Sequence, residues 1–278
     1  MTDLSVTIAG IRFPFCIMNA SGALSTTREE LLALAESQSG AIVTKSITVS
    51  SFLDPGARCG LENPGYAYYV ELLPELARYG KPIMASVAGM TTNEYVTVAR
   101  ALAQAGASLI ELNLSDPHVQ EHVAPFTSAE RLWALLRAVR KEVSVPLAIK
   151  FPPVVPLSYP ETAAILSEAG VEIVVCHNNL AKDGDVVLSQ VTELHTASGG
   201  RLDIIGVGGV CDGEDAYAAL QGGARAIQIG SALVKEGPSV FARLYREMMG
   251  QALRTGVQLN APSGQALRTD ATCRVSTE

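Results

Sequence analysis

Four chemically active side-chain types lie close together at the end of the stretch ELNLSDPH, which begins at Glu111. They are an amide, a hydroxyl, a carboxylate and an imidazole, supplied by Asn113, Ser115, Asp116 and His118. Such a set can accept a proton and hydrogen-bond a polar ligand. The alternative interpretation is a capped turn, because Asp-Pro is ordinary turn chemistry and Ser or Asp often caps a helix.

Alternating strands and helices must position these residues. Apolar segments predict strands over residues 13–19, 41–45, 82–89, 108–114, 146–150, 171–179, 203–209 and 225–231. Helical periodicity predicts helices over residues 28–37, 66–77, 93–105, 128–142, 161–169, 185–196, 214–221 and 239–253. Eight such units in 278 residues predict a single α/β domain, a (β/α)8 TIM barrel, with a doubly wound open sheet as the alternative. We expect the polar tail from about residue 256 to be flexible.

Composition restricts the partners and the compartment. The formal net charge of -7 argues against a nucleic-acid binder, which usually carries a basic patch. Residue 1 is not followed by a signal-like segment, and no apolar run reaches about 18 residues, so we expect a cytoplasmic protein without a membrane partner. The five cysteines are scattered without a CxxC pair, which predicts reduced thiols and no metal site.

The predicted strands end in residues that suit a binding site. Lys45 and Lys150 end two of them, and in a barrel all such ends meet at one mouth, where active sites lie. Glycines follow the seventh and eighth strands, at Gly208-Gly209 and at Gly230-Ser231. Barrels commonly bind phosphate at these two loops, so the pattern favours a phosphorylated ring cofactor or a sugar phosphate.

Taken together, the motifs resemble the dihydroorotate dehydrogenase family, most closely its class 1A, over nearly the whole chain. The segments are NASG (19–22), TKS (44–46), GLENPG (60–65), SVAGM (86–90), ELNLSDP (111–117), IKFPP (149–153), HNN (177–179), IIGVGG (204–209) and AIQIGSALVKEGP (226–238). The resemblance implies a homodimeric flavoprotein that oxidises dihydroorotate to orotate in pyrimidine biosynthesis. FMN would accept the hydride.

The resemblance also implies roles for particular residues. Expected contacts to FMN come from Ala20, Ser21, Gly22, Lys45, Asn113, Lys150, Gly208, Gly209, Gly230 and Ser231. Expected contacts to the substrate come from Lys45, Gly60, Leu61, Asn63, Asn113, Asn178 and Asn179. Lys45 would stabilise the substrate carboxylate, and Lys150 the reduced flavin.

The chain departs from the family at the catalytic base. Asp116 stands where class 1A has cysteine, and His118 stands where the family has a substrate-binding asparagine. A carboxylate, with a reference pKa of about 3.9, is a weaker base than a thiolate at about 8.5. Asp116 or His118 is therefore the candidate base. Two alternatives stay open, namely a flavoprotein acting on another small cyclic amide or unsaturated acid, and a non-redox barrel protein.

Overall fold

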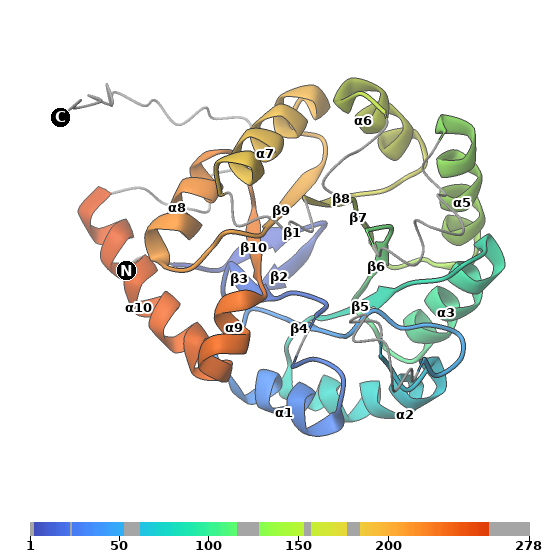
Figure 1. Ribbon diagram of the computed structural model, residues 1–278, viewed down its shortest axis with the longest axis horizontal. Helices are drawn as coiled ribbons and strands as arrows, with labels where there is room; N and C mark the ends of the chain where they lie inside the picture. Colours follow the sequence, from blue (N-terminus) through green and yellow to red (C-terminus); the bar gives the residue numbers. More distant parts are fainter. Residues whose placement is uncertain are drawn as a thin grey trace.

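Parallel strands form a barrel at the centre of the molecule. The computed structural model describes residues 3–22, 24–52, 62–115, 128–152, 157–176 and 184–255, except for the side chains of 184–188 and 255. Its main sheet has eight strands, and a ring of helices surrounds them (Figure 1). In chain order the strands are β3 (Ile17–Asn19), β4 (Ile42–Val43), β5 (Ile83–Val87), β6 (Leu109–Asn113), β7 (Leu147–Lys150), β8 (Ile173–Cys176), β9 (Asp203–Val207) and β10 (Ala226–Ile229).

The order of the strands identifies the fold. Each strand from β4 to β9 pairs in parallel with the next one along the chain, and β10 pairs with β3. An order that advances in one direction and returns to the first strand is that of a barrel, whereas a doubly wound sheet reverses its order. The prediction of a (β/α)8 barrel is confirmed, and the doubly wound alternative is wrong.

A side chain closes the barrel between β3 and β4, which are the two ends of the sheet as described. Asn19 donates from Nδ2 to the carbonyl oxygen of Val43 (2.6 Å), and the Val43 N–H donates to Asn19 Oδ1 (2.9 Å). Beside this seam, the Gly40 N–H donates to the carbonyl oxygen of Ile17 (2.8 Å). A Cβ at Gly40 would lie 1.8 Å from the carbonyl oxygen of Phe15, so the close approach requires glycine.

Helices cover the outside of the barrel and bury one face each. They are α1 (Arg28–Glu36), α2 (Tyr66–Leu76), α3 (Thr92–Gln104), α5 (Ala129–Glu142), α6 (Tyr159–Glu168), α7 (Gly184–Ser198), α8 (Gly213–Gln221), α9 (Ser231–Glu236) and α10 (Val240–Thr255), with short 3-10 turns at Ala77–Tyr79 and Gly237–Ser239. In α5 the buried residues Leu132, Leu135, Leu136 and Val139 recur at helical spacing. Ser128 caps this helix by accepting from the Arg131 N–H.

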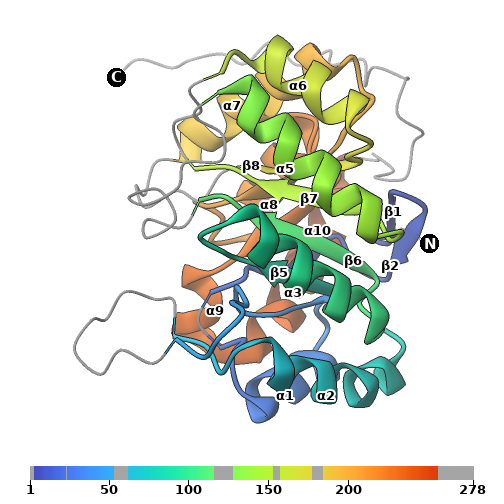
Figure 2. The same ribbon diagram turned by 90° about the vertical axis from the view of Figure 1, so that its right-hand side faces the viewer.

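An antiparallel hairpin lies across one end of the barrel. It consists of β1 (Val6–Ile8) and β2 (Ile11–Phe13). The Ala9 N–H donates to Oδ2 of Asp203, the first residue of β9, at 2.7 Å. The hairpin therefore lies at the amino ends of the strands, while α9 lies at the opposite end (Figure 2). The carboxyl ends, where active sites lie in such barrels, face away from it.

Three elements differ from the sequence-based expectations. The strand expected over 13–19 is divided, because β2 ends at Phe13 and the Cys16 N–H donates to the Leu4 carbonyl oxygen (2.9 Å) before β3 begins. The strand expected over 41–45 is only two residues long. Helix α9 was not predicted, because its six residues directly follow a strand and are too few to show helical periodicity.

Candidate active site

The ends of β6 and β7 bring an amide and an ammonium next to each other. Asn113 ends β6 and Lys150 ends β7, and the two are register partners. Both side chains are buried, with Asn113 4% and Lys150 3% exposed. The structure thus brings together two of the predicted site residues at the mouth of the barrel.

The ammonium of Lys150 is held by two uncharged acceptors. Its Nζ donates to Ser21 Oγ (3.2 Å), which follows β3, and to Gln228 Oε1 (3.4 Å) on β10. Among the residues that the structure describes, no carboxylate forms an ion pair with Lys150. A buried cation without a directly bonded anion is costly, and such groups are common at functional sites.

The amide of Asn113 is fixed at both ends. Its Nδ2 donates to Ser46 Oγ (2.8 Å), and its Oδ1 accepts from the N–H (3.0 Å) and the hydroxyl (2.6 Å) of Ser115. The Tyr95 hydroxyl donates to the Asn113 carbonyl oxygen (2.9 Å). This support leaves the amide little freedom to rotate when a ligand binds.

A polar layer lies below these two residues, inside the barrel. Glu111 is fully buried and accepts from Ser86 Oγ (2.8 Å) and from Gln228 Nε2 (2.9 Å). Branched apolar side chains usually fill barrel interiors, so a carboxylate at this depth is unusual. Neither Glu111 nor Gln228 was among the residues predicted for the site. One signal was present, since Glu111 stands two residues before Asn113 and a strand directs such residues to the same side.

Two glycine-containing loops lie at neighbouring strand ends. Gly208 and Gly209 follow β9 with φ of 110° and 71°, a region that favours glycine. A Cβ at Gly230, which follows β10, would meet nothing within 4 Å. In the β9–β10 pair Val207 is the partner of Gln228, so the two loops begin side by side. The open backbone and its position fit the phosphate site predicted from the sequence.

The remaining described members of the predicted site also lie at strand ends. The Ala20 N–H donates to the Ile229 carbonyl oxygen (2.9 Å), and a Cβ at Gly22 would meet open space. Ser231 is exposed and begins α9. Lys45 follows β4 with only 7% of its surface exposed. These placements are compatible with the predicted contacts, which stay predictions.

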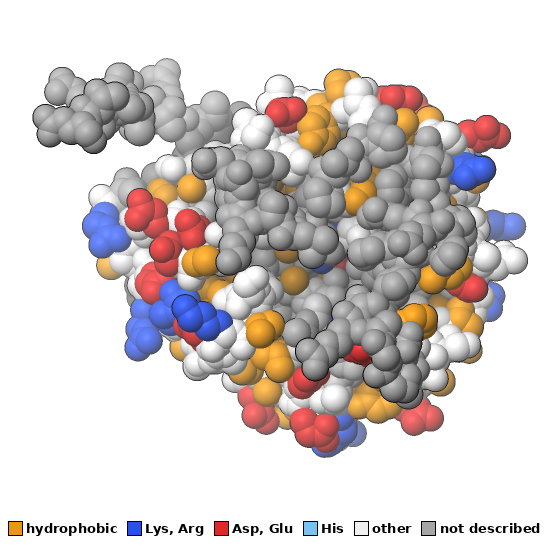
Figure 3. Space-filling model, in the orientation of Figure 1, with side chains coloured by type: hydrophobic (Ala, Val, Ile, Leu, Met, Phe, Trp, Pro, Cys, Tyr) orange, Lys and Arg blue, Asp and Glu red, His pale blue; other side chains and the backbone are white. Residues whose placement is uncertain are grey.

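A partly exposed ion network supports the loop after β9 from outside. Arg243 on α10 donates to the Cys211 carbonyl oxygen (2.9 Å) and pairs with Glu236 and Glu247 (2.8 and 2.9 Å). Glu247 also accepts from the Gly213 N–H (2.8 Å). Hydrogen bonds from Arg243 hold the pKa of Glu236 below its usual value. Figure 3 shows acidic and basic side chains together over α8, α9 and α10.

Asn63 lies at the base of the long loop between β4 and α2. Its backbone pairs with Phe52 in an antiparallel bridge, and its Oδ1 accepts from the Gly65 N–H (2.9 Å). Its Nδ2 donates to Thr48 Oγ1 (3.0 Å). These contacts join the two ends of the loop, as expected of a residue that supports it. A contact between Asn63 and a substrate stays a prediction.

Several predicted site residues lie outside the described residues. They are both candidate bases and four substrate contacts, namely Asp116, His118, Gly60, Leu61, Asn178 and Asn179. The tail from residue 256 lies outside as well. Their roles therefore stay predictions.

The buried thiols are unsuited to replace the cysteine expected as the base in class 1A. Cys16 is fully buried, and burial raises its pKa to about 12. Cys176, the last residue of β8, is also fully buried, and burial raises its pKa even further. A thiol with so high a pKa stays protonated near neutral pH and is not a useful general base.

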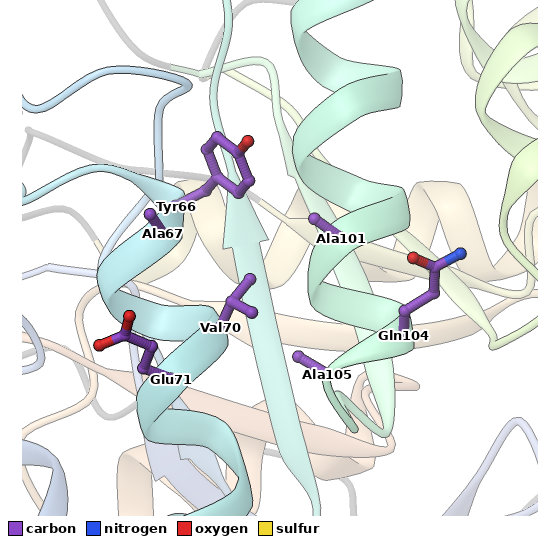
Figure 4. Close-up of a pocket in the computed structure, with 7 residues that line it drawn as sticks. All are labelled: Tyr66, Ala67, Val70, Glu71, Ala101, Gln104 and Ala105. Carbon is purple, nitrogen blue, oxygen red and sulfur yellow. The ribbon is translucent and has the colours of Figure 1, made fainter.

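A separate groove lies outside the barrel, between α2 and α3 (Figure 4). It has a volume of about 380 Å³, and its lining includes the apolar side chains of Ala67, Val70 and Ala101. Its lining contains no member of the predicted site. The groove and the mouth of the barrel are thus distinct features.

The described ranges contain neither a metal-binding cluster nor a membrane-spanning helix. No group of three or more His, Cys, Asp or Glu side chains in these ranges is arranged to hold a metal ion. None of the helices in the same ranges is long and apolar enough to cross a membrane.

Known proteins match this chain over nearly its whole length. The family model described as dihydroorotate dehydrogenase matches residues 3–187 and 181–251. A protein of Streptococcus equi subsp. equi (strain 4047), named "Putative dihydroorotate dehydrogenase A (fumarate)", is 30% identical over 298 aligned residues. The alignment covers 93% of this chain and 96% of the relative. A protein of the same name from Streptococcus pyogenes serotype M1 is also 30% identical, with the same coverage.

Solved structures share the fold. The dihydroorotate dehydrogenase of Eimeria tenella in complex with ferulenol superposes with a TM-score of 0.82 at 17% sequence identity, over 96% of this chain and 89% of that one. The ligand-free form of the same enzyme gives a TM-score of 0.80, over 96% of this chain and 92% of that one. At this identity the likeness concerns the barrel alone.

Proposed function

The chain belongs to the dihydroorotate dehydrogenase family of oxidoreductases, and we propose that it oxidises dihydroorotate to orotate with FMN as the hydride acceptor. The observation that carries the proposal is the buried ammonium of Lys150 at the mouth of the barrel, held by Ser21 and Gln228. A fixed cation in that position suits a ring system that becomes anionic when it is reduced.

The donor set at the mouth fits FMN. The open backbone at Gly22 and Gly230 leaves room for a ligand, and neighbouring loops after β9 and β10 suit a phosphate. The residues proposed to hold the cofactor are Ala20, Ser21, Gly22, Lys45, Asn113, Lys150, Gly208, Gly209, Gly230 and Ser231. Bound there, FMN would supply the two-electron acceptor that the chain itself lacks.

The substrate end of the proposed reaction rests on the loop that follows β6. Asp116 or His118 removes the proton from the carbon next to the carbonyl group, and Lys45 stabilises the substrate carboxylate. Asn113 is held rigidly by Ser46 and Ser115, which suits an amide that orients a ring. The other proposed substrate contacts are Gly60, Leu61, Asn63, Asn178 and Asn179.

The biological setting belongs to the same proposal. The resemblance supports a role in pyrimidine biosynthesis, in the cytoplasm and as a homodimer. The curated relatives carry the word fumarate in their names, which makes fumarate the first oxidant to test.

The deciding experiment is anaerobic mixing of the purified, FMN-loaded protein with dihydroorotate while the flavin absorbance is followed. Rapid bleaching, reversed by an added oxidant such as fumarate, is the expected result. A yellow protein that does not bleach would refute dihydroorotate as the substrate and favour another small cyclic amide or unsaturated acid. A protein that takes up no FMN would refute the flavin function and favour the non-redox alternative.

A variant assigns the base. Asp116→Ala should slow flavin reduction by about 10²–10⁴-fold if Asp116 takes the proton, because that is the usual contribution of a general base. His118→Ala serves as the comparison, since it should have the larger effect if the imidazole is the base. An unchanged rate in Asp116→Ala would exclude Asp116 from this role.

A further inference from the structure

One unbroken path of hydrogen bonds crosses the interior of the barrel from Lys150 to Asn113. The ammonium of Lys150 donates to Gln228 Oε1 (3.4 Å), and Gln228 Nε2 donates to Glu111 Oε2 (2.9 Å). The other carboxylate oxygen of Glu111 accepts from Ser86 Oγ (2.8 Å). Glu111 on β6 and Gln228 on β10 are separated by three strands in the sheet, so their side chains meet across the barrel.

The path continues to the loop that carries the candidate base. Ser86 Oγ lies 3.2 Å from Ser46 Oγ, and Asn113 Nδ2 donates to Ser46 Oγ (2.8 Å). Asn113 Oδ1 in turn accepts from Ser115, the residue directly before Asp116. The four side chains of this part of the path are each at most 4% exposed, namely Ser46, Ser86, Asn113 and Ser115. The two ends of the proposed site are therefore connected inside the protein.

The chemistry of the groups fixes the direction of the path. A carboxylate only accepts hydrogen bonds, and an ammonium only donates them. The amide of Gln228 lies between them, so its oxygen must face Lys150 and its nitrogen must face Glu111. The opposite orientation would set two donors against each other and two acceptors against each other. Gln228 is thus a rigid spacer between one buried positive and one buried negative charge.

We propose that Glu111 and Gln228 are positioning residues that set the location and the effective charge of Lys150 and hold Asn113 through Ser86. The inference rests on the proposed flavin function. Glu111 offsets part of the positive potential of Lys150, and the cofactor at the mouth experiences the difference between the two charges. The site thereby has a built-in control of how strongly its cation favours the reduced flavin.

The test is the midpoint potential of the bound flavin, measured by equilibration with a reference dye. Lys150→Gln removes the positive charge and should lower the potential. Glu111→Gln removes the negative charge and should raise it. A unit charge removed from a protein interior near the flavin should change the ratio of reduced to oxidised flavin by about tenfold or more.

Glu111→Gln is suited to this purpose because it keeps the shape and the hydrogen bonds. The new amide oxygen can accept from Gln228, and its nitrogen can donate to Ser86, whose hydroxyl can accept as well as donate. Ser46→Ala is the matched control, because it removes the hydroxyl that accepts from Asn113 and leaves the hydrogen bonds of Glu111 to Ser86 and Gln228 in place. Its flavin potential should stay at the wild-type value, while the KM for the substrate rises.

Only the charge arrangement predicts that Lys150→Gln and Glu111→Gln shift the flavin midpoint potential in opposite directions. General loosening of the barrel would shift both potentials in the same direction. A potential in Glu111→Gln that is unchanged or lowered would overturn the inference.

A second measurement separates the inference from the proposed function. In the full chain without FMN, the thermal midpoints of Glu111→Gln, Lys150→Gln and the double variant form a cycle. Each single change leaves the opposite charge uncompensated. The fall in thermal midpoint of the double variant should therefore be smaller than the sum of the two single falls, by about 3 °C or more. Additive losses would overturn the charge pairing even if FMN binds. Failure to bind FMN would refute the proposed function and leave this cycle valid.

Discussion

The barrel should lose much of its stability when the side-chain amide of Asn19 is removed from the seam between β3 and β4. Asn19→Ala deletes the side chain that bonds both backbone groups of Val43, at 2.6 and 2.9 Å. Asn19 and Val43 are both fully buried, so water cannot replace the lost partner without opening the barrel. A buried backbone group left without a partner costs about 1–3 kcal/mol. Two such groups predict a loss of about 2–6 kcal/mol in the free energy of unfolding, a large fraction of the stability of an ordinary domain.

The assay is urea denaturation of the purified chain, followed by circular dichroism. Asn93→Ala provides the matched control, because Asn93 is exposed on α3 and such surface changes stay within about 0.5 kcal/mol. Asn19→Asp keeps the acceptor for the Val43 N–H but sets a carboxylate oxygen against the Val43 carbonyl. We expect it to lose at least as much stability as Asn19→Ala at neutral pH. A loss below about 1 kcal/mol in Asn19→Ala would refute the view that this side chain closes the barrel.

Two further predictions concern the surface near the loop after β9. Arg243 lowers the pKa of Glu236, so their interaction stabilises the folded state above the usual carboxyl range and is lost as the pH falls through the lowered value. Thermal unfolding of Arg243→Met should therefore show a lower midpoint than the wild type at pH 7 and a smaller difference at pH 3, whereas a difference independent of pH would contradict this account. Cys211 is exposed and Cys16 is buried with a raised pKa, so Cys211→Ser should remove one rapidly reacting thiol in a disulfide-exchange assay. Cys16→Ser should leave that count unchanged, and equal losses in the two variants would contradict the assignment.

Local signals in the sequence predicted most of the fold. The stretch 93–105 shows a helical period, and α3 occupies Thr92–Gln104. The stretch 28–37 also shows a helical period, and α1 occupies Arg28–Glu36, with a capping box of Thr27 and Glu30 at its start. Such features depend on neighbours within a few residues, so a reader of the sequence can see them. Helix α9 was missed for the opposite reason, because its six residues are shorter than two helical turns and follow a strand directly.

The candidate site was predictable only in part. Lys150 and Asn113 could be identified because they end predicted strands, and strand ends converge at the mouth of a barrel. The contact between Glu111 and Gln228 could not, because 117 positions separate them and only closure of the barrel brings β6 and β10 face to face. The role of Asn19 at the seam was hidden likewise, since it depends on which two strands end the sheet.

The hairpin at the amino ends of the strands has a consequence for synthesis on the ribosome. The hairpin is anchored by residues that are made much later, since Ala9 bonds Asp203 across 194 positions and Thr7 accepts from Arg225 across 218. At a synthesis rate of about 5–20 residues per second, these partners are made about 10–40 s after the hairpin. During that interval its apolar side chains, including Ile8 and Phe13, lack their final packing. The nascent chain therefore offers an early binding site for chaperones, and slow translation of the segment between the hairpin and these partners would lengthen that exposure.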